Sequence, residues 1–319
     1  MIAVLTGGTG GAKFVDGLRR VLPPEELTII VNTGDDHVWW GLYVSPDIDS
    51  IVYVLADLLS GERGWGVRGD TFHCLHAMKE LGEEVWFSVG DRDLATHLLR
   101  TQLLSKGQTL SAATARIAKK LGVRSRILPM SDMRVETRID TPAGELSFEE
   151  YFVKRWYQDP VQAVHFVGSS DAEPAPGVVA AIASAQAVLI APSNPVTSIG
   201  PILAVPGIRR ALQATPANVV AVSPIIGNEA VSGPAANLMT AQGLPVSIAG
   251  VAKAYEDFLD ILISHDSDAT TAESLATDRL QLQCTDIMMR STADKTRIAR
   301  TALTLACPEL LTESAAGGE

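Results

Sequence analysis

The sequence predicts an α/β protein, with a parallel sheet covered by helices on both faces and a smaller inserted α+β subdomain. The first observation is that short apolar runs recur, each followed by a polar loop and a helix-compatible segment: residues 2–5, 27–31, 85–89, 187–191 and 219–222. Continuous apolar strands that alternate with helices are typical of a parallel sheet buried on both faces. The second observation is that residues 123–166 break this rhythm.

The irregular segment predicts a separate unit within the chain. Residues 134–139 alternate polar and apolar side chains, and residues 141–145 have the composition of a turn, so we expect an antiparallel hairpin. We therefore divide the chain into a parallel-sheet core (1–122 and 163–307), an inserted hairpin or subdomain (123–162) and a frayed tail (308–319).

Composition and charge exclude several classes of function for this chain. The 319 residues carry a formal net charge of -11, which argues against non-specific nucleic-acid binding, because that requires Lys and Arg to neutralise phosphates. The three cysteines lie far apart and fit neither a disulfide framework nor a metal-ligand spacing. No run reaches the roughly 18 consecutive apolar residues of a membrane span. We expect a cytoplasmic protein with no nucleic-acid or membrane partner.

The glycine-rich loop after the first apolar run is the strongest functional signal. Residues 6–13 read TGGTGGAK, and a helix is expected directly after the glycines. Glycines let a ligand approach the backbone, and a helix N-terminus attracts phosphate. The loop is not a Walker A motif, because Ala12 replaces its second glycine, and Lys13 replaces the third glycine of the dinucleotide fingerprint. It predicts an anion site of unspecified ligand, with a purely structural turn as the alternative.

Four carboxylates follow the second apolar run within a short stretch. Asp35 and Asp36 come directly after the predicted strand, and Asp47 and Asp49 precede a predicted helix. Adjacent carboxylates near a phosphate site are a usual way to hold Mg²⁺. Asp47 or Asp49 alone is explained equally well as a helix cap. Together, the four favour a metal or catalytic site.

A helix is expected from residue 91 to about residue 105. His97 and Arg100 follow Asp93 at offsets of four and seven, so the three share one face that could line an active site. For His97 alone, a surface helix with an Asp–His pair is the simpler interpretation. Arg92, in the turn that precedes this face, could form forked bonds to a carboxylate, a phosphate or a planar heterocycle.

A second rigid loop follows the run at 187–191 and contains Ser193, Asn194 and Pro195. No Gly-x-Ser-x-Gly sequence surrounds the serine, so hydrolase chemistry is not indicated, and we expect the loop to face a ligand. Trp65, between two glycines, could stack on a flat ring. Packing in a core or at a dimer contact is the commoner role of a tryptophan.

Taken together, these loops resemble the 2-phospho-L-lactate transferase family of deazaflavin coenzyme F-420 biosynthesis, which includes phosphoenolpyruvate transferases. The matching stretches occur in order from residue 1 to about residue 290: 7–13, 32–36, 46–50, 63–66, 90–101, 192–203, 223–227 and 285–286. The resemblance implies a Rossmann-like catalytic core, a homodimer and dependence on Mg²⁺.

The resemblance also implies a reaction. A phospho-lactyl, phospho-enolpyruvyl or phospho-glyceryl group passes from a diphosphoguanosine donor to the ribityl hydroxyl of the deazaflavin alcohol Fo. GMP leaves, and F-420-0 or its dehydro form results. The residues implied for the donor nucleotide are Gly8, Thr9, Gly10, Gly11, Lys13, Ser193, Asn194 and Pro195.

Further roles follow from the same resemblance. The implied catalytic residues are Asp49, Asp36 and Arg92, and the implied magnesium ligands are Asp35, Asp36 and Asp49. The positions matching Asp49 and Arg92 are associated with deazaflavin binding, and we add Trp65 and His97 as candidates for it. Asp49 is expected beside the attacking hydroxyl.

Two other functions remain as alternatives. The related gluconeogenesis factors are regulators that bind nucleotide sugars and share a glycine-rich start, but they lack the forms of residues 32–36 and 90–101 seen here. The second alternative, an NAD-dependent oxidoreductase, is supported only by the strand–loop–helix pattern at the start of the sequence. The transferase is therefore the favoured prediction.

Overall fold

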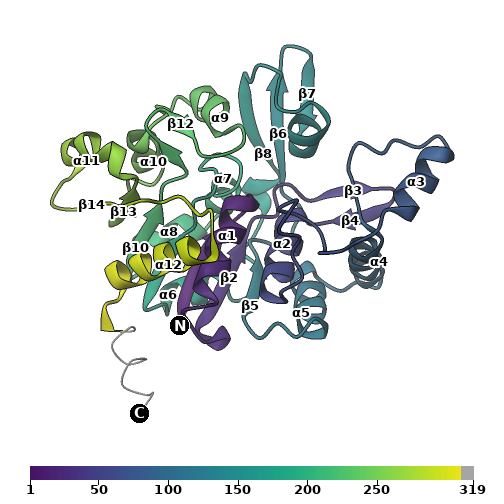
Figure 1. Cartoon of the computed structure of the whole chain (residues 1–319), viewed down its shortest axis with the longest axis horizontal. Helices are drawn as coiled ribbons and strands as arrows, with labels where there is room; N and C mark the ends of the chain where they lie inside the picture. The colour runs from purple at the N-terminus through teal and green to yellow at the C-terminus, as the bar shows by residue number, and fades with distance from the viewer. Residues whose placement is uncertain (310–319) are drawn as a thin grey trace.

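A seven-stranded sheet forms the centre of the computed structural model, which describes residues 1–309 of the chain (Figure 1). All neighbouring strands in this sheet are parallel. In spatial order they are β14 (Gln281–Cys284), β13 (Ile261–Ser264), β10 (Asn218–Val222), β9 (Ala187–Ile190), β1 (Ile2–Thr6), β2 (Leu27–Val31) and β5 (Arg126–Pro129). The tail predicted to be frayed, 308–319, lies outside the described residues from position 310 onward.

Successive strand residues pack on opposite faces of this sheet, because side chains alternate along a strand. Val4 belongs to a core with α1 (Gly8–Leu18), α2 (Pro46–Leu55), α5 (Leu110–Lys120) and α12 (Thr292–Ala306). Leu5 belongs to the opposite core, with α6 (Val178–Ala183), α7 (Gly200–Ala204), α8 (Ile208–Ala214), α9 (Ala235–Ala241), α10 (Ile248–Ala254) and α11 (Ala269–Leu275). The predicted α/β class, with helices on both faces of a parallel sheet, is confirmed.

One predicted strand is wrong. Residues 85–89 form no strand. The strand at the edge of the sheet next to β2 is instead β5, which the sequence did not indicate. Val89 is buried against Trp39, and Trp86 and Phe87 complete this small separate cluster. The apolar run therefore packs in an aromatic cluster against the hairpin of β3 (His37–Trp39) and β4 (Leu42–Val44). This hairpin lies next to α3 (His73–Glu80) and α4 (Asp91–Ser105) (Figure 1).

The chain order creates a topological switch point between β1 and β9. From β1 the chain continues to β2 on one side, whereas β9 pairs with β1 on the other side. In open parallel sheets, ligands bind beyond the carboxyl ends of the strands at such a point. The glycine-rich loop after β1 and the loop after β9 both start there.

A three-stranded antiparallel sheet stands beside the carboxyl end of β2. Its order is β7 (Gly144–Ser147), β6 (Glu136–Thr141) and β8 (Ala163–Val167), so the predicted hairpin is confirmed (Figure 1). The backbone N–H of Thr137 donates to the carbonyl of Gly34 at 2.7 Å and joins this sheet to the core. The predicted boundary at residue 162 separates β7 from β8, although both pair with β6. A further short hairpin joins β11 (Ile225–Ile226) and β12 (Glu229–Ala230).

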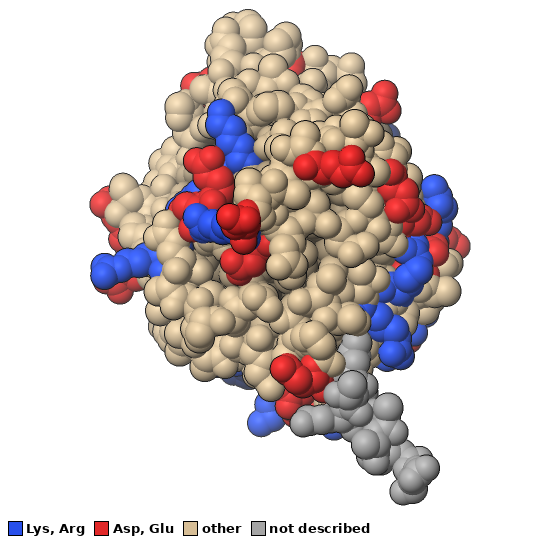
Figure 2. All heavy atoms as spheres, turned by 90° about the vertical axis from the view of Figure 1, so that its left-hand side faces the viewer, with Lys and Arg blue, Asp and Glu red and all other residues tan. Residues whose placement is uncertain are grey.

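Within residues 1–309, no helix combines the length and the apolar character that crossing a membrane requires. On the face shown in Figure 2, acidic and basic side chains of the described chain lie in small mixed groups without a continuous basic surface.

Candidate functional site

Asn32 connects the loop after β2 to the N-terminus of α2. Its Nδ2 donates to Asp35 Oδ2 and to Asp47 Oδ2, each at 2.9 Å. Asp47 Oδ1 accepts a hydrogen bond from the backbone N–H of Gly8 at 2.7 Å. Burial raises the pKa of Asp47 to about 6. The glycine-rich loop, the loop after β2 and α2 thus share one buried polar network, in which the sequence assigned Asn32 no role.

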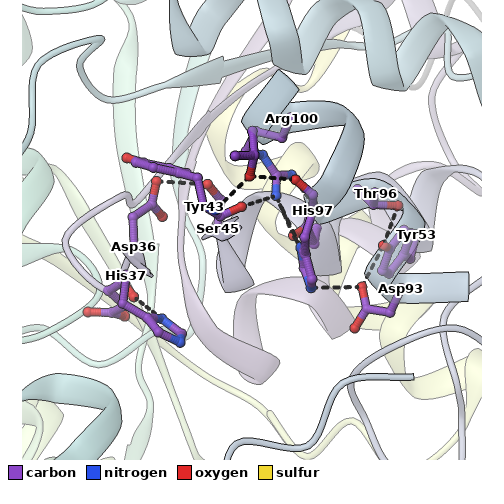
Figure 3. A network of polar contacts seen from close by, with 12 residues as sticks. Asp36, His37, Tyr43, Ser45, Tyr53, Asp93, Thr96, His97 and Arg100 are labelled. Carbon is purple, nitrogen blue, oxygen red and sulfur yellow. Dashed lines mark hydrogen bonds and ion pairs between the residues drawn. The ribbon is translucent and has the colours of Figure 1, made fainter. Parts of the chain in front are cut away.

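In Asp35 and Asp36, which lie beside this network, one oxygen of each carboxylate has a hydrogen-bond donor and the other has none in the described part of the chain. Each residue is 7% exposed, and the Oδ1 atom of each has no hydrogen-bond partner among the described residues. Asp36 Oδ2 accepts from Ser45 Oγ at 2.8 Å (Figure 3). Burial raises the pKa of both carboxyl groups well above the usual range, and the charge of Asp47 adds to the effect at Asp35. Such a pair fits a hard divalent cation.

Asp49 and Arg100 form a bidentate ion pair. Arg100 Nη1 donates to Asp49 Oδ2 at 3.0 Å, and Nη2 donates to Oδ1. His97 lies one turn before Arg100 on α4, with Nδ1 3.5 Å from Asp49 Oδ2 and Nε2 3.5 Å from Asp93 Oδ1 (Figure 3). Burial lowers the pKa of His97 to about 4, so its ring is neutral at pH 7. The face predicted from helical spacing therefore points into the protein rather than to solvent.

Ligand atoms of Asp49, Asp93 and His97 lie within 4.8 Å of one another, as in a metal site. Arg100, however, is part of the same group: its Nη1 lies 3.4 Å from His97 Nδ1. A buried guanidinium opposes a second cation at this distance. The Asp49 group is therefore a poor site for Mg²⁺, and the unpartnered Oδ1 atoms of Asp35 and Asp36 are the remaining candidates.

The two loops at the switch point are packed against each other. Ser193 Oγ donates to the carbonyl of Gly7 at 2.6 Å. A Cβ atom on Gly10 would lie 2.3 Å from the carbonyl oxygen of Pro192, and one on Gly11 would lie 1.9 Å from Thr6 Oγ1. A side chain at Gly10 would collide with the loop after β9, and one at Gly11 would collide with Thr6 and with Ser193 Oγ at 2.9 Å, so both positions require glycine.

Gly8 differs from the other glycines of the loop. Its φ is +66°, and a Cβ atom there would have its nearest neighbour, Ser198 Oγ, at 3.4 Å. Thr9 and Lys13 are exposed on α1. Asn194 is half-buried and Pro195 is buried, and Asn194 Oδ1 accepts from the N–H of Val196 at 2.9 Å. The structure brings the predicted donor-binding residues to one edge of the sheet, with Gly8 and Thr9 at the accessible end.

A cavity of about 230 Å³ lies between α2, α4 and α5. Most of its lining is apolar, with Tyr53, Thr96, Lys120 and the exposed Arg92 as its polar members. Trp65 is 37% exposed and lies two residues before Val67, which lines the same cavity. The hydroxyl of Tyr53 lies 2.7 Å from Asp93 Oδ1 (Figure 3). Arg92 and the loop of Trp65 thus meet at one cavity, next to the Asp93–His97 contact.

A second cavity, of about 60 Å³, lies between the loop after β2 and the antiparallel sheet. Asp35 and Asp36 line one side, and Arg134, Arg138 and the buried Glu149 line the other. Burial raises the pKa of Glu149 to about 8, and the charges of Asp47 and Asp36 contribute. The sequence did not single out these three residues, because the pattern of a hairpin does not tell which core loop it packs against.

Comparisons with known proteins agree over most of the chain. A family model described as 2-phospho-L-lactate transferase CofD matches residues 2–303. The chain is 42% identical over 298 residues to a 2-phospho-L-lactate transferase of Methanosarcina mazei, covering 93% of this chain and 97% of that protein. It is 41% identical over 311 residues to a phosphoenolpyruvate transferase of Streptomyces griseus, covering 96% and 98%.

A solved structure supports the fold alone. It is that of a UPF0052 family protein from Bacillus halodurans, with a TM-score of 0.64, 16% sequence identity, and 95% of this chain and 98% of that chain covered. Together with the switch-point loops and the buried carboxylates, the family match leads to one conclusion. The chain belongs to the 2-phospho-L-lactate transferase family and is an enzyme of that transferase type.

Proposed function

We propose that this enzyme moves a phospho-lactyl, phospho-enolpyruvyl or phospho-glyceryl group from its diphosphoguanosine donor to the deazaflavin alcohol Fo. GMP leaves, and F-420-0 or its dehydro form results. The observation that carries the proposal is the pair of buried carboxylates, Asp35 and Asp36, each with an unpartnered Oδ1 atom, beside the glycine-rich loop in a chain of this family. Phosphoryl transfer asks a protein mainly for positioning and for neutralisation of charge.

The residues present suit those two tasks. Asp35 and Asp36 would hold Mg²⁺, which supplies charge neutralisation at a transferred phosphoryl group. The first turn of α1 has backbone N–H groups without helical partners, and these attract the phosphates of a nucleotide. In this structure, Asp47 accepts the N–H of Gly8, so Thr9 and Gly10 offer the next donors.

The acceptor would lie on the α4 side of the site. The mostly apolar cavity that includes Arg92 has the chemistry for a planar ring with polar edges, and Trp65, two residues before the lining residue Val67, would stack on that ring. Asp49, oriented by Arg100, would accept a hydrogen bond from the ribityl hydroxyl and direct that oxygen toward the phosphorus. The proposal includes the homodimer implied by the resemblance and the cytoplasmic location expected from the composition.

A mass-spectrometric transfer assay tests the proposal. Purified protein, Mg²⁺ and Fo are mixed in parallel with lactyl-, enolpyruvyl- and glyceryl-diphosphoguanosine. An Fo phosphodiester together with GMP is the expected result, and the fastest donor identifies the three-carbon acid. Folded protein that forms no product from any donor would overturn the proposal and favour a binding or regulatory role.

A further inference from the structure

The cavity of about 60 Å³ beside Asp35 and Asp36 has an acidic core wall and an opposite wall of mixed charge, where Arg134 and Arg138 lie with Glu136 and Glu149. The core wall carries Asp35 and Asp36. The opposite wall comes from the antiparallel sheet, where Arg134 and Arg138 flank Glu136 at intervals of two residues. Arg134 lies two residues before β6, and the other two belong to the strand. Because side chains alternate along an extended chain, this spacing places all three on the same face.

The two arginines share one carboxylate. Arg134 contacts Glu136 through Nε, and Arg138 contacts Glu136 through Nε at 2.9 Å and through Nη2. Arg138 Nη1 has a distant ion pair with the half-exposed Glu145, at 3.9 Å. Arg134 has one ion pair among the described residues, through Nε, so its terminal nitrogens keep their donors free. Guanidinium groups with free N–H donors are suited to bidentate contact with a carboxylate.

The arginine wall lies close to the site of transfer. The positive charge of Arg134 acts on Tyr43, and the negative charge of Asp36 acts on the same phenol. Burial is the largest cause of the raised pKa of Tyr43, and Asp36 raises it further while Arg134 lowers it. Arg134 and Asp36 also line the same cavity, so the arginines and the aspartates face one space.

A ligand that fits both walls must carry two different groups. Its phosphate would face the cation held by the aspartates, and a second anionic group, a short distance away, would face the arginines. The cavity is much smaller than the one beside Arg92, so it suits a chain of few atoms rather than a ring system. This is the chemistry of a short phosphorylated carboxylic acid.

We propose that Arg134 and Arg138 bind the carboxylate of the donor's three-carbon acid, so that the antiparallel sheet selects the acid and the core loops bind the nucleotide. This inference rests on the proposed function, because it names the place of one part of the proposed donor. Both arginines are binding residues in this assignment. Glu136 is a positioning residue that holds Arg134 through Nε and Arg138 through Nε and Nη2.

Equilibrium binding without Fo tests this assignment, because no transfer takes place. The affinities of GDP and of the donor that the transfer assay selects are measured by calorimetry in the presence of Mg²⁺. GDP lacks the three-carbon acid, so the ratio of the two affinities reports the contribution of the acid. Wild type is expected to bind the donor more tightly than GDP.

The variants are Arg134→Gln, Arg138→Gln and the double variant, with Arg155→Gln as the matched control. Arg155 belongs to the same segment of the chain but pairs with Asp159 at the surface. Each variant at Arg134 or Arg138 should lower the affinity for the donor about tenfold or more, since each removes a charge-assisted hydrogen bond. The affinity for GDP should stay unchanged. The control should change neither.

Two results would overturn the assignment. One is a double variant whose ratio of donor to GDP affinity equals that of wild type. The other is an equal loss of affinity for GDP and for the donor, which would indicate a general effect on the fold. Failure of the proposed function is a separate result, because it appears as a wild-type protein that forms no product with any donor.

Discussion

Arg100 and Asp49 contact each other through two parallel hydrogen bonds at a place where the guanidinium has no solvent exposure and Asp49 has 4%. The pair joins α4 to α2 and fixes the carboxylate that the proposed mechanism places beside the acceptor hydroxyl. The charge of Asp49 also explains why a buried arginine is tolerated, since an unpaired buried cation would be very costly.

We expect Arg100→Met to destabilise the protein by about 3–5 kcal/mol, because the substitution leaves the Asp49 carboxylate buried without its partner. Urea unfolding at pH 7 measures the change. Arg116→Met, at an exposed position of α5, is the matched control and should lie within about 0.5 kcal/mol of wild type. The double variant Arg100→Met/Asp49→Leu should recover much of the loss, and no recovery would mean that packing rather than charge dominates.

Asp36→Asn should separate metal binding from folding. The substitution keeps an oxygen that can accept the Ser45 hydrogen bond but removes a charge from a group of buried acids. We therefore expect the metal-free variant to be at least as stable as wild type. Wild type should gain about 2.7 kcal/mol when Mg²⁺ is at one hundred times its Kd, and the variant should gain far less at the same concentration.

Thermal unfolding midpoints across a Mg²⁺ titration provide the measurement for Asp36→Asn. Asp278→Asn, at an exposed position, is the control and should keep the full response to Mg²⁺. An Asp36→Asn protein that Mg²⁺ stabilises as much as wild type would exclude Asp36 as a ligand.

The glycine-rich loop provides a test of packing. Gly10→Ala places a methyl group 2.3 Å from the carbonyl oxygen of Pro192, so one of the two loops must move. We expect a loss of about 1–3 kcal/mol, as for other overpacked sites. Gly61→Ala is the control, because nothing lies within 4 Å of the added methyl group. Equal stability of the two variants in urea unfolding would refute the close contact between the loops.

The strands that the sequence predicted correctly are the buried ones. A parallel strand covered on both faces is a continuous apolar run, as in β1 and β9, and such a run needs no partner to be recognised. Residues 85–89 have the same composition, and their burial arises instead from an aromatic cluster with Trp39. An apolar run predicts burial, but it does not identify the surface that covers it.

The same distinction applies to the site. That Asp35 and Asp47 share one region could be predicted, because both lie in the stretch from the carboxyl end of β2, a buried strand, to the first turn of α2. Helical spacing placed His97 and Arg100 on one face but could not tell that Asp49 was their partner. Glu149 packs near Asp36 across more than a hundred residues of sequence. That contact depends on how the antiparallel sheet docks, which no local pattern encodes.

Asp16 lies outside the site, and its ion pairs should make the stability of the contact between α1 and α12 depend on pH. On α1, its carboxylate accepts from Lys295 of α12 at 3.0 Å and from Arg19 at 2.7 Å. Burial alone would raise the pKa of Asp16, but the hydrogen bonds from Lys295 and Arg19 outweigh it and hold the pKa below 3.8. A carboxyl group whose pKa is lower in the folded state stabilises the fold above its unfolded pKa, about 3.9, and loses this effect as the pH falls through the folded value.

We therefore expect Asp16→Asn to lower the free energy of unfolding by about 1–3 kcal/mol at pH 7, and the gap to wild type to shrink as the pH falls below about 4. Urea unfolding across this pH range measures both quantities. Asp57→Asn is the control: Asp57 also pairs with Arg19, but its side chain is 69% exposed, so solvent screens the ion pair and the variant should differ little from wild type. If the gap for Asp16→Asn stays as wide at pH 3 as at pH 7, the ionised carboxylate is not what joins α1 to α12. Asparagine has nearly the same shape as aspartate, so a gap that does not depend on pH would contradict a stabilising role for the ion pairs of Asp16.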